Sequence, residues 1–430
     1  MRSSTLGDCF RLTTFGESHG PAVGVVLDGV RPGLALTEQD IQRELDRRRP
    51  GQSDVTSPRQ EPDRAEILSG VFEGRTTGAP ICILVRNRDA RPSDYDELRE
   101  VFRPGHGDFA WLAKYAVRDH RGGGRLSGRE TVARVAAGAV AKRLLEPLGV
   151  RIVAHTVAVG PIEAKTYDES QIERNPMRCA DAAAAVAMAE HVRQVQGAGD
   201  SVGGVVEIRA TGVPPGWGDP VFYKLDAMLA MGLMSIGGVK GVEVGDGFRA
   251  ATMRGSKHND PLGPMGFLTN HAGGVLGGIS TGAPVVVRIA VKPTSSIALP
   301  QQTVDLHGRP RTLRLRGRHD PCLCARIVPV AEAMVAIVLA EACLRQQAIA
   351  GRPITIRDAE ASLALADADL VLCLARRVAL ASELRRLQAR EPARGRARER
   401  EVRTRWRRLA REAGLDVAVA QRVLDAILPD

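Results

Sequence analysis

The chain has 430 residues, of which 44% are hydrophobic and 26% charged, the balance of a soluble globular protein with room for two domains. Its formal net charge is +10, so the excess of arginine serves either nucleic acid or a small polyanion. Aromatic residues make up only 3%, which argues against nucleic acid held by stacked rings, and many arginines of the first 330 residues stand singly beside glycine and histidine, which favours a pocket for a small polyanionic substrate.

The first part of the chain mixes predicted strands and helices in no regular order. Apolar and β-branched runs predict strands at 10–15, 22–27, 67–72, 81–85, 202–210 and 285–291. Helical periodicity and alanine content predict helices at 37–48, 131–145, 180–196 and 329–346. Thr37 is expected to cap the first helix, with Asp40 close to a capping-box position, and the last helix is expected to be buried. Because regular βαβ alternation is absent, we expect a mixed α/β fold that is not doubly wound.

The composition changes after Gly351, where glycine becomes rare and alanine, leucine and arginine dominate. A helix is predicted over 363–387, a second over 398–411, and a third after Leu415. On the first of these, one face is expected to carry residues seven apart, namely Leu363, Leu370, Arg377 and Leu384. We therefore predict two domains, 1–350 and 358–430, of which the second is small and all-α.

The cysteines and the apolar segments point to a cytoplasmic protein. The seven cysteines are odd in number and lack the spacing of a disulfide framework. Cys322 and Cys324 form a CxC pair without a matching second pair, so no metal site is expected. The N-terminus has no apolar signal region, and we expect no stretch long and apolar enough to span a bilayer.

Two histidines lie in glycine-bounded loops. His19 belongs to the turn GESHG, and His106 belongs to RPGH. Histidine can transfer protons near neutral pH, which is the functional interpretation. The alternative is that each ring only fixes its own loop by hydrogen bonds. Two such histidines among many arginines favour function.

Arginine and hydroxyl side chains recur beside flexible backbone. Guanidinium groups bind phosphate and carboxylate bidentately, with roughly 1.5–3 kcal/mol per hydrogen bond to a charged group. A few converging arginines would hold a trianionic metabolite, although scattered surface charge explains most arginines of the chain. The turn Lys292–Ser296 (KPTSS) could cradle a phosphate. No Walker A loop and no dinucleotide-binding GxGxxG loop is present.

Taken together, these segments resemble one family. GESHG, DRRRPG, EPD, RPGH, GGGR-S-RET-RVAAGA, NHAGG, KPTSS and GRHDPC occur in the order of the chorismate synthases, from about Thr5 to Leu344. The resemblance implies 1,4-elimination of phosphate from 5-enolpyruvylshikimate 3-phosphate to give chorismate. It also implies a requirement for reduced FMN without net redox change, a sandwich of antiparallel sheets around helices, and a homotetramer.

The resemblance also implies roles for individual residues. His19 would protonate the departing phosphate, His106 would protonate the reduced flavin, and Glu341 matches an aspartate thought to help the flavin accept the substrate's proton. The substrate would be held by Arg48, Arg103, Arg129 and Arg326. FMN would be held by Arg125, Leu126, Ser127, Gly237, Gly238, Gly277, Lys292, Pro293, Thr294, Ser295, Ser296 and Arg318.

Several positions depart from the family pattern. Leu126 and Gly128 replace a serine and an alanine, Glu341 is one methylene longer than the family aspartate, and Gly237 replaces an asparagine. A contact with NADP would involve Arg48 and position 54, which is often basic in the family. Because position 54 is Asp54 in this chain, we expect an external flavin reductant.

The tail resembles the all-helical class of chorismate mutase. The resemblance rests on the run from Arg377 to Ala381, on Pro392, on Arg398-Glu399-Arg400 and on Leu415-Asp416, and it implies a mutase-like site with Arg377, Arg398 and Glu399. Three family positions differ, at Glu360, Gln388 and Gly395. Three interpretations stay open: a working mutase, a degenerate one that helps assembly, or a basic helical module that binds a partner or nucleic acid.

Overall fold

A computed structural model describes residues 3–53, 55–56, 61–89, 92–264, 266–315 and 319–349 of the first part of the chain. Beyond residue 350 it describes 395–412 and 416–427, together with seven helical residues, 363, 367, 370, 374, 375, 378 and 382. The chain divides into two compact units, Met1–Arg352 and Pro353–Asp430.

One layer of the first unit is a five-stranded sheet in which every pairing is antiparallel. Its spatial order is β1 (Thr5–Leu6), β2 (Arg11–Phe15), β3 (Ala22–Asp28), β7 (Ile81–Arg86) and β4 (Ala65–Ser69). The predicted strands at 10–15, 22–27 and 81–85 are confirmed. The predicted strand 67–72 is broken by Gly70, whose φ is +81°, and continues as β5 (Val71–Phe72), which pairs with β6 (Arg75–Thr76).

The second layer is another antiparallel five-stranded sheet, and its core face is built from β-branched residues. Its spatial order is β11 (Val239–Val244), β16 (Val285–Val291), β10 (Gly204–Thr211), β8 (Arg151–Val159) and β9 (Ile162–Glu163). Along β10, Val206, Ile208 and Ala210 are buried, while Glu207 and Arg209 between them are only half-buried. This alternation is the pattern of a strand with one face on the core.

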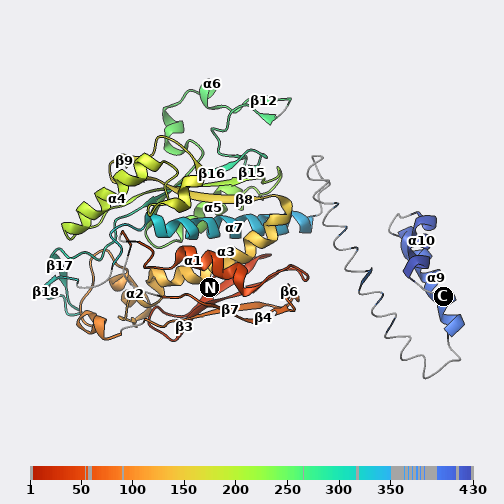
Figure 1. The fold of residues 1–430 in the computed structure, drawn as a ribbon, viewed down its shortest axis with the longest axis horizontal. Coiled ribbons are helices and arrows are strands. Elements are labelled where there is room, and N and C mark those ends of the chain that lie inside the picture. Colours follow the sequence, from red (N-terminus) through yellow and green to blue (C-terminus); the bar gives the residue numbers. More distant parts are fainter. Residues whose placement is uncertain are drawn as a thin grey trace. The chain divides into compact units, whose positions relative to one another are not determined.

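Helices fill the space between the two sheets, so the first unit is a sandwich of mixed α/β type (Figure 1). The inner helices are α1 (Glu38–Arg48), α3 (Thr131–Leu145), α5 (Leu225–Met234) and α7 (Cys324–Ile349). Helix α4 (Ala182–Gly197) packs against β8 and β9. The predicted cap of α1 is confirmed, because Thr37 and Asp40 form a complete capping box.

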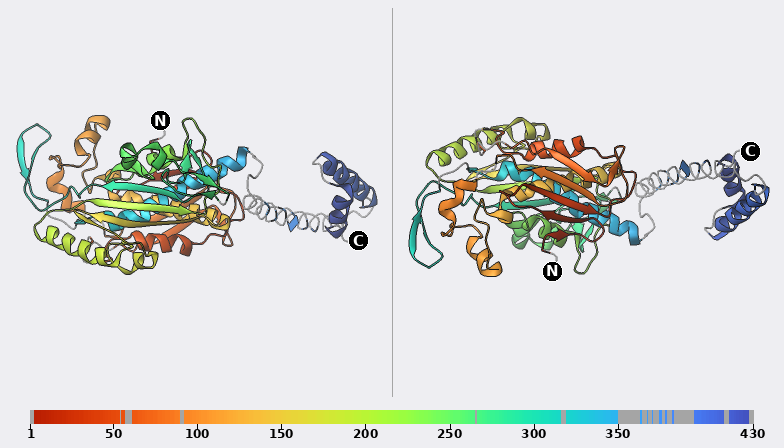
Figure 2. Two further views of the ribbon diagram at one scale, coloured as in Figure 1. Left: turned by 90° about the horizontal axis from the view of Figure 1, so that it is seen from above. Right: turned by 90° about the horizontal axis from the view of Figure 1, so that it is seen from below.

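Short elements complete the first unit. The helices are η1 (Pro92–Leu98), α2 (Asp108–Tyr115), η2 (Gly124–Leu126), η3 (Gly128–Glu130), η4 (Glu146–Leu148), η5 (Glu169–Arg174), η6 (Gly247–Thr252) and α6 (Gly255–His258). The hairpins are β12 (Leu262–Gly263) with β13 (Gly266–Phe267), β14 (Val275–Leu276) with β15 (Ile279–Ser280), and β17 (Gln301–Val304) with β18 (Pro310–Leu313). The β17–β18 hairpin projects from one end of the unit in both views of Figure 2.

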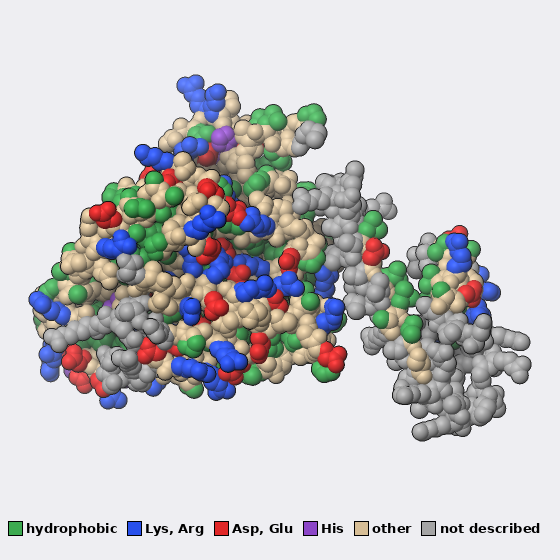
Figure 3. Space-filling model, viewed as in Figure 1, with side chains coloured by type: hydrophobic (Ala, Val, Ile, Leu, Met, Phe, Trp, Pro, Cys, Tyr) green, Lys and Arg blue, Asp and Glu red, His purple; other side chains and the backbone are tan. Residues whose placement is uncertain are grey.

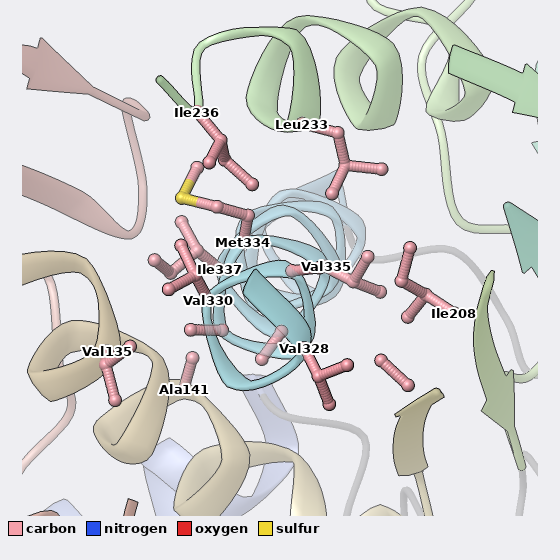
Figure 4. Packing of buried hydrophobic residues seen from close by; sticks show 14 of the residues in the cluster. Val135, Ala141, Ile208, Leu233, Ile236, Val328, Val330, Met334, Val335 and Ile337 are labelled. Carbon is pink, nitrogen blue, oxygen red and sulfur yellow. The ribbon is translucent and has the colours of Figure 1, made fainter. Parts of the chain in front are cut away.

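Helix α7 is the centre of the core and packs closely on α3. A Cβ atom added to Gly138 of α3 would lie 2.3 Å from the Cβ of Ala333 on α7, so this helix crossing requires glycine. Around α7, Met334 faces Ile236 and Leu233 of the α5 region (Figure 4). Volume changes at such a close-packed contact are costly.

Helix α7 differs from two expectations, one on where it begins and one on whether any segment could cross a membrane. The helix begins at Cys324, five residues before the predicted start at Pro329, so the proline lies inside it. Proline cannot donate to the carbonyl of Ala325 four residues earlier, and Nη1 of Arg178 donates to that oxygen instead, at 2.7 Å. The helix is also long and apolar enough to cross a membrane, contrary to our expectation, but 89% of its most apolar window is buried inside the protein, as in a core helix.

Glu332, in the third turn of α7, connects this helix with α1, α3 and β8. Its carboxylate accepts hydrogen bonds from Arg47 of α1 at 2.6 and 3.0 Å, from Lys142 of α3 at 2.7 Å and from the backbone N–H of Ala154 in β8 at 3.0 Å. Burial opposes its ionisation, but Lys142 and Arg47 outweigh burial and hold the pKa of Glu332 well below its usual range. The core is therefore built around a paired buried charge.

In the second unit, α9 (Gly395–Glu412) packs against α10 (Val417–Ile427). Nε1 of Trp406 donates to the carbonyl of Ala420 at 2.8 Å, and Leu424 is fully buried. Of the predicted face of helix 363–387, Leu363 and Leu370 are exposed. Arg377 and Leu384 lie outside the described residues.

Candidate active site

A cavity of about 730 Å³ in the first unit brings together most of the predicted site residues. Its walls come from the start of the chain, from the 103–107 loop, from η2 and η3, from the turn after α5, from the 292–296 turn and from the first turns of α7. The predicted residues that line it are Arg48, Arg103, His106, Arg125, Leu126, Ser127, Arg129, Gly237, Gly238, Lys292, Thr294, Ser295, Ser296 and Arg326.

Arg48 and Arg129 share a buried carboxylate. Asp63, which is fully buried, accepts from Nη1 of Arg48 at 3.1 Å and from Nη1 of Arg129. Arg129 also donates from Nε to Asn87 at 2.8 Å, whereas Nε of Arg48 is buried without a hydrogen-bond partner. Burial lowers the pKa of Arg48 to about 9, which Asp63 opposes. Both side chains line the cavity, so Arg48 keeps a buried donor for an anion.

Two further arginines are held by carboxylates. Asp108, at the start of α2, accepts from Nε and Nη2 of Arg103 at 2.8 and 2.9 Å, which is a bidentate pair. Asp320 accepts from Nη1 of Arg326. The cationic side of the cavity is therefore fixed in place before any ligand binds.

On the face drawn in Figure 3, basic and acidic side chains of the first unit are interspersed rather than gathered by sign. Such a surface does not offer the single-sign stripe that binds a nucleic-acid backbone. The charge that can act on a ligand lies in the buried arginines of the cavity.

His106 is held between two loops. Its Nδ1 donates to the carbonyl of Pro104 at 3.0 Å, and its Nε2 lies 3.0 Å from Oγ of Ser296. Lys292 and Ser295 donate to the carbonyl of Gly105 at 2.8 and 2.9 Å, which fixes the 292–296 turn to the RPGH loop. Burial, followed by the charge of Arg103, lowers the pKa of His106 to about 4. The ring is therefore neutral near pH 7 in the ligand-free protein.

The variant His106→Gln is expected to lose less stability than the parent protein on acidification. The folded-state pKa is about 4 against an ordinary value of 6.5, so below pH 6.5 the unfolded chain takes up a proton that the folded chain does not. The stability contributed by the neutral ring is fully present above pH 6.5 and is lost as the pH falls towards 4. Urea unfolding at about pH 7 and about pH 5 measures this difference. Equal losses in the two proteins would contradict the assignment.

His19 lies at the wall of the cavity, although its own side chain is not among the lining residues. It is 8% exposed, and its ring makes an edge contact with Tyr95 at a centroid distance of 4.8 Å. A Cβ atom on Gly122 would lie 2.4 Å from Cδ2 and 2.6 Å from Nε2 of His19. Ser18, Tyr95 and Gly122 line the cavity, so His19 is one layer behind its surface.

The variant Gly122→Ala is expected to fold but to lose activity by displacing His19. Gly122 has a φ of +62°, which side chains other than glycine adopt only with strain, and an added methyl group would overlap the imidazole ring. A misplacement of about 1 Å at a reacting centre can cost on the order of 10²-fold in rate. Gly74→Ala is the matched control, since its φ is +72° and an added Cβ would meet nothing within 4 Å. Equal activities of the two variants would remove His19 from the mechanism.

The residues expected to hold FMN are partly engaged with the protein. Arg125 donates from Nη2 to Oγ1 of Thr14 at 2.7 Å. The hydroxyl of Thr294, in contrast, is buried without a hydrogen-bond partner. Nothing lies within 4 Å of the position where a Cβ of Gly237 would stand, so the space of the missing asparagine is open.

Other predicted residues are not brought to the cavity. Glu341 does not line it, because its Oε2 accepts from the N–H groups of Cys9 and Phe10 at 2.9 and 2.7 Å and its Oε1 from Arg345. These hydrogen bonds close the turn after β1, which is a structural role for the Glu341 carboxylate. Gly277, in the turn between β14 and β15, does not line the cavity either, nor does Pro293. Three predicted residues lie outside the described part of the chain, namely Asp54, Arg318 and Arg377. Arg398 and Glu399 lie on α9.

Several residues of the site were missed from the sequence. Asp320 and His319 line the cavity, and burial lowers the pKa of His319. Both belong to the GRHDPC segment, so that segment was the available signal. Arg134 lines the cavity as well, where it pairs with Glu130 at 2.8 Å and donates to Ser235 at 2.5 Å. It is the first residue of the RVAAGA segment, so that segment was the available signal.

Converging buried arginines beside a neutral histidine define an enzyme that acts on a small polyanion. The sequence profile described as "Chorismate synthase" matches residues 10–344. Curated relatives are also named "Chorismate synthase". That of Syntrophobacter fumaroxidans is 59% identical, over 79% of this chain and 97% of the relative. That of Chloroflexus aurantiacus is 56% identical, over 81% of this chain and 97% of the relative. A solved structure described as "Crystal Structure of Chorismate Synthase" aligns with a TM-score of 0.63 and 31% identity, over 84% of this chain and 98% of that one.

The chain belongs to the chorismate synthase family. Its first unit carries the activity of a phosphate-eliminating lyase, which converts 5-enolpyruvylshikimate 3-phosphate to chorismate.

Proposed function

We propose that the cavity holds 5-enolpyruvylshikimate 3-phosphate beside reduced FMN. The observation that carries this proposal is the buried, unpartnered Nε of Arg48, next to Arg129 and in the same cavity as His106. The substrate has two carboxylates and a phosphate, which Arg48, Arg103, Arg129 and Arg326 would hold. A cavity of about 730 Å³ is in the range that takes small molecules and cofactors.

The residues of the 292–296 turn fit the flavin. The buried hydroxyl of Thr294 lacks a partner and lies at the cavity, as a group awaiting a ligand oxygen would. Arg125, Ser127, Lys292 and Ser295 would complete the binding set. When bound, reduced FMN supplies an electron-rich group to a reaction without net redox change.

The two histidines are proposed to move protons. His19, behind Gly122, would give a proton to the departing phosphate. His106 would give a proton to the bound reduced flavin, whose negative charge would favour the protonated ring over the neutral one. Proton transfer by a positioned side chain typically contributes 10²–10⁴-fold to a rate.

Phosphate release tests the proposal. The purified chain, given chemically reduced FMN without oxygen, is expected to release phosphate from 5-enolpyruvylshikimate 3-phosphate. No release would refute the proposed site, and equal release without flavin would refute the flavin requirement. We further propose an external flavin reductant, because position 54 is Asp54. NADPH in place of the chemical reductant should then give no release, and turnover with NADPH alone would refute this part.

We also propose a homotetramer in the cytoplasm. Large apolar side chains of the first unit are exposed to solvent, among them Phe222 at 89% and Phe248 at 82%. Such exposure is expected of a surface that another copy of the chain covers. Light scattering on the eluting protein measures the mass, and a monomer would refute the assembly.

For the second unit we propose a small all-helical, chorismate mutase-like domain. The packed pair α9–α10 supports the helical part, and Arg398 and Glu399 lie on α9. Formation of prephenate from chorismate by the full chain, abolished in Arg398→Ala, would support a working mutase. Its absence would favour a degenerate domain, and steeply salt-dependent binding of DNA would favour a nucleic-acid module.

A further inference from the structure

The tautomer of His106 is fixed by its surroundings. The carbonyl of Pro104 can only accept, so Nδ1 must carry a proton in both the neutral and the charged ring. Only Nε2 can gain or lose a proton. Any acid–base role of His106 therefore runs through Nε2.

Nε2 faces a protein hydroxyl at hydrogen-bond distance. Oγ of Ser296 lies 3.0 Å away, and Ser296 is 8% exposed and lines the cavity. In the neutral ring, Ser296 donates to Nε2. In the charged ring, Nε2–H donates to Oγ, which turns the serine O–H towards the cavity. Both ring nitrogens are thus engaged by protein groups.

We propose that Ser296 relays the proton between His106 and the ligand in the cavity. This rests on the proposed function of His106 as an acid. The proton on Nε2 passes to Oγ while the proton of Oγ passes to a basic atom of the ligand, so the serine is unchanged and the ring becomes neutral. The charged groups around the ring are Arg103 and Lys292, which disfavour its protonation, and Asp108, which favours it.

The relay differs from direct transfer in one consequence. If His106 acted directly, its ring would have to release Ser296, and removal of the hydroxyl would leave the rate unchanged or raise it. In the relay, removal of the hydroxyl interrupts the path while the histidine stays in place. The variants Ser296→Ala and Ser296→Thr therefore distinguish the relay from direct transfer, because threonine keeps the hydroxyl and alanine does not.

The first measurement uses ligand-free protein. With ¹⁵N-labelled histidine, Ser296→Ala should shift the Nε2 resonance of His106 while Nδ1 stays protonated, and Ser296→Thr should resemble the wild type. The exposed Ser170→Ala is the control and should change nothing. An unshifted Nε2 resonance in Ser296→Ala would overturn the contact and with it the relay.

The second measurement is turnover at saturating reduced FMN, with flavin affinity determined separately. Ser296→Ala should lower kcat by about 10²-fold or more, with a much smaller effect on KM, and Ser296→Thr should restore most of it. Wild-type kcat in Ser296→Ala, despite a shifted resonance, would overturn the relay. Failure of the proposed function is distinct, because the wild-type protein itself would then release no phosphate.

Discussion

Arg129→Ala is expected to lose about 10²- to 10⁴-fold in kcat/KM. A guanidinium that binds an anion bidentately makes two charge-assisted hydrogen bonds of roughly 1.5–3 kcal/mol each, and about 1.4 kcal/mol is a factor of ten. The loss should be large because Arg129 is 4% exposed and is already fixed by Asp63 and Asn87. Binding of an anion therefore costs little side-chain conformational entropy at this residue. Steady-state phosphate release measures the loss.

Two variants make this result interpretable. Arg129→Lys keeps the charge but cannot reach Asn87, Asp63 and an anion together, so an intermediate loss is expected. Arg151→Ala removes an exposed arginine whose carboxylate partner is Glu169, and it should retain full activity. If Arg129→Ala and Arg151→Ala performed alike, Arg129 would not be a substrate ligand.

The sequence predicted the elements of the fold well where local pattern decides. The capping box at Thr37 and the helix 131–145 are specified by neighbouring residues, and both are confirmed. The predicted start of α7 at Pro329 was wrong, because a residue far away in the sequence makes a proline inside this helix possible. Arg178 supplies the donor that Pro329 lacks, and no local pattern shows this contact across 147 residues.

The candidate site was predictable as a set of residues but not as a set of partnerships. Most of the residues predicted for the site line the cavity. The motifs could not show that Arg48 and Arg129 share Asp63, because 15 and 66 residues separate the partners along the chain. The resemblance assigned Glu341 the role of a family aspartate that helps the flavin accept a proton. In the structure, the carboxylate that lines the cavity beside Arg326 is that of Asp320.

Glu332→Ala is expected to lower the free energy of unfolding by about 3 kcal/mol, the lower end of the usual cost of removing one partner of a buried ion pair, because Arg47 and Lys142 are partly exposed and keep Glu44. Arg47 and Lys142 would both lose their buried acceptor, and the N–H of Ala154 would lose its partner. Glu146→Ala is the matched control, because Glu146 pairs with Arg143 but its side chain is 64% exposed, where an ion pair contributes about 0–1 kcal/mol. Urea unfolding followed by circular dichroism compares the two variants near neutral pH. If the two losses were equal, the buried network of α7 would carry no more stability than a surface ion pair.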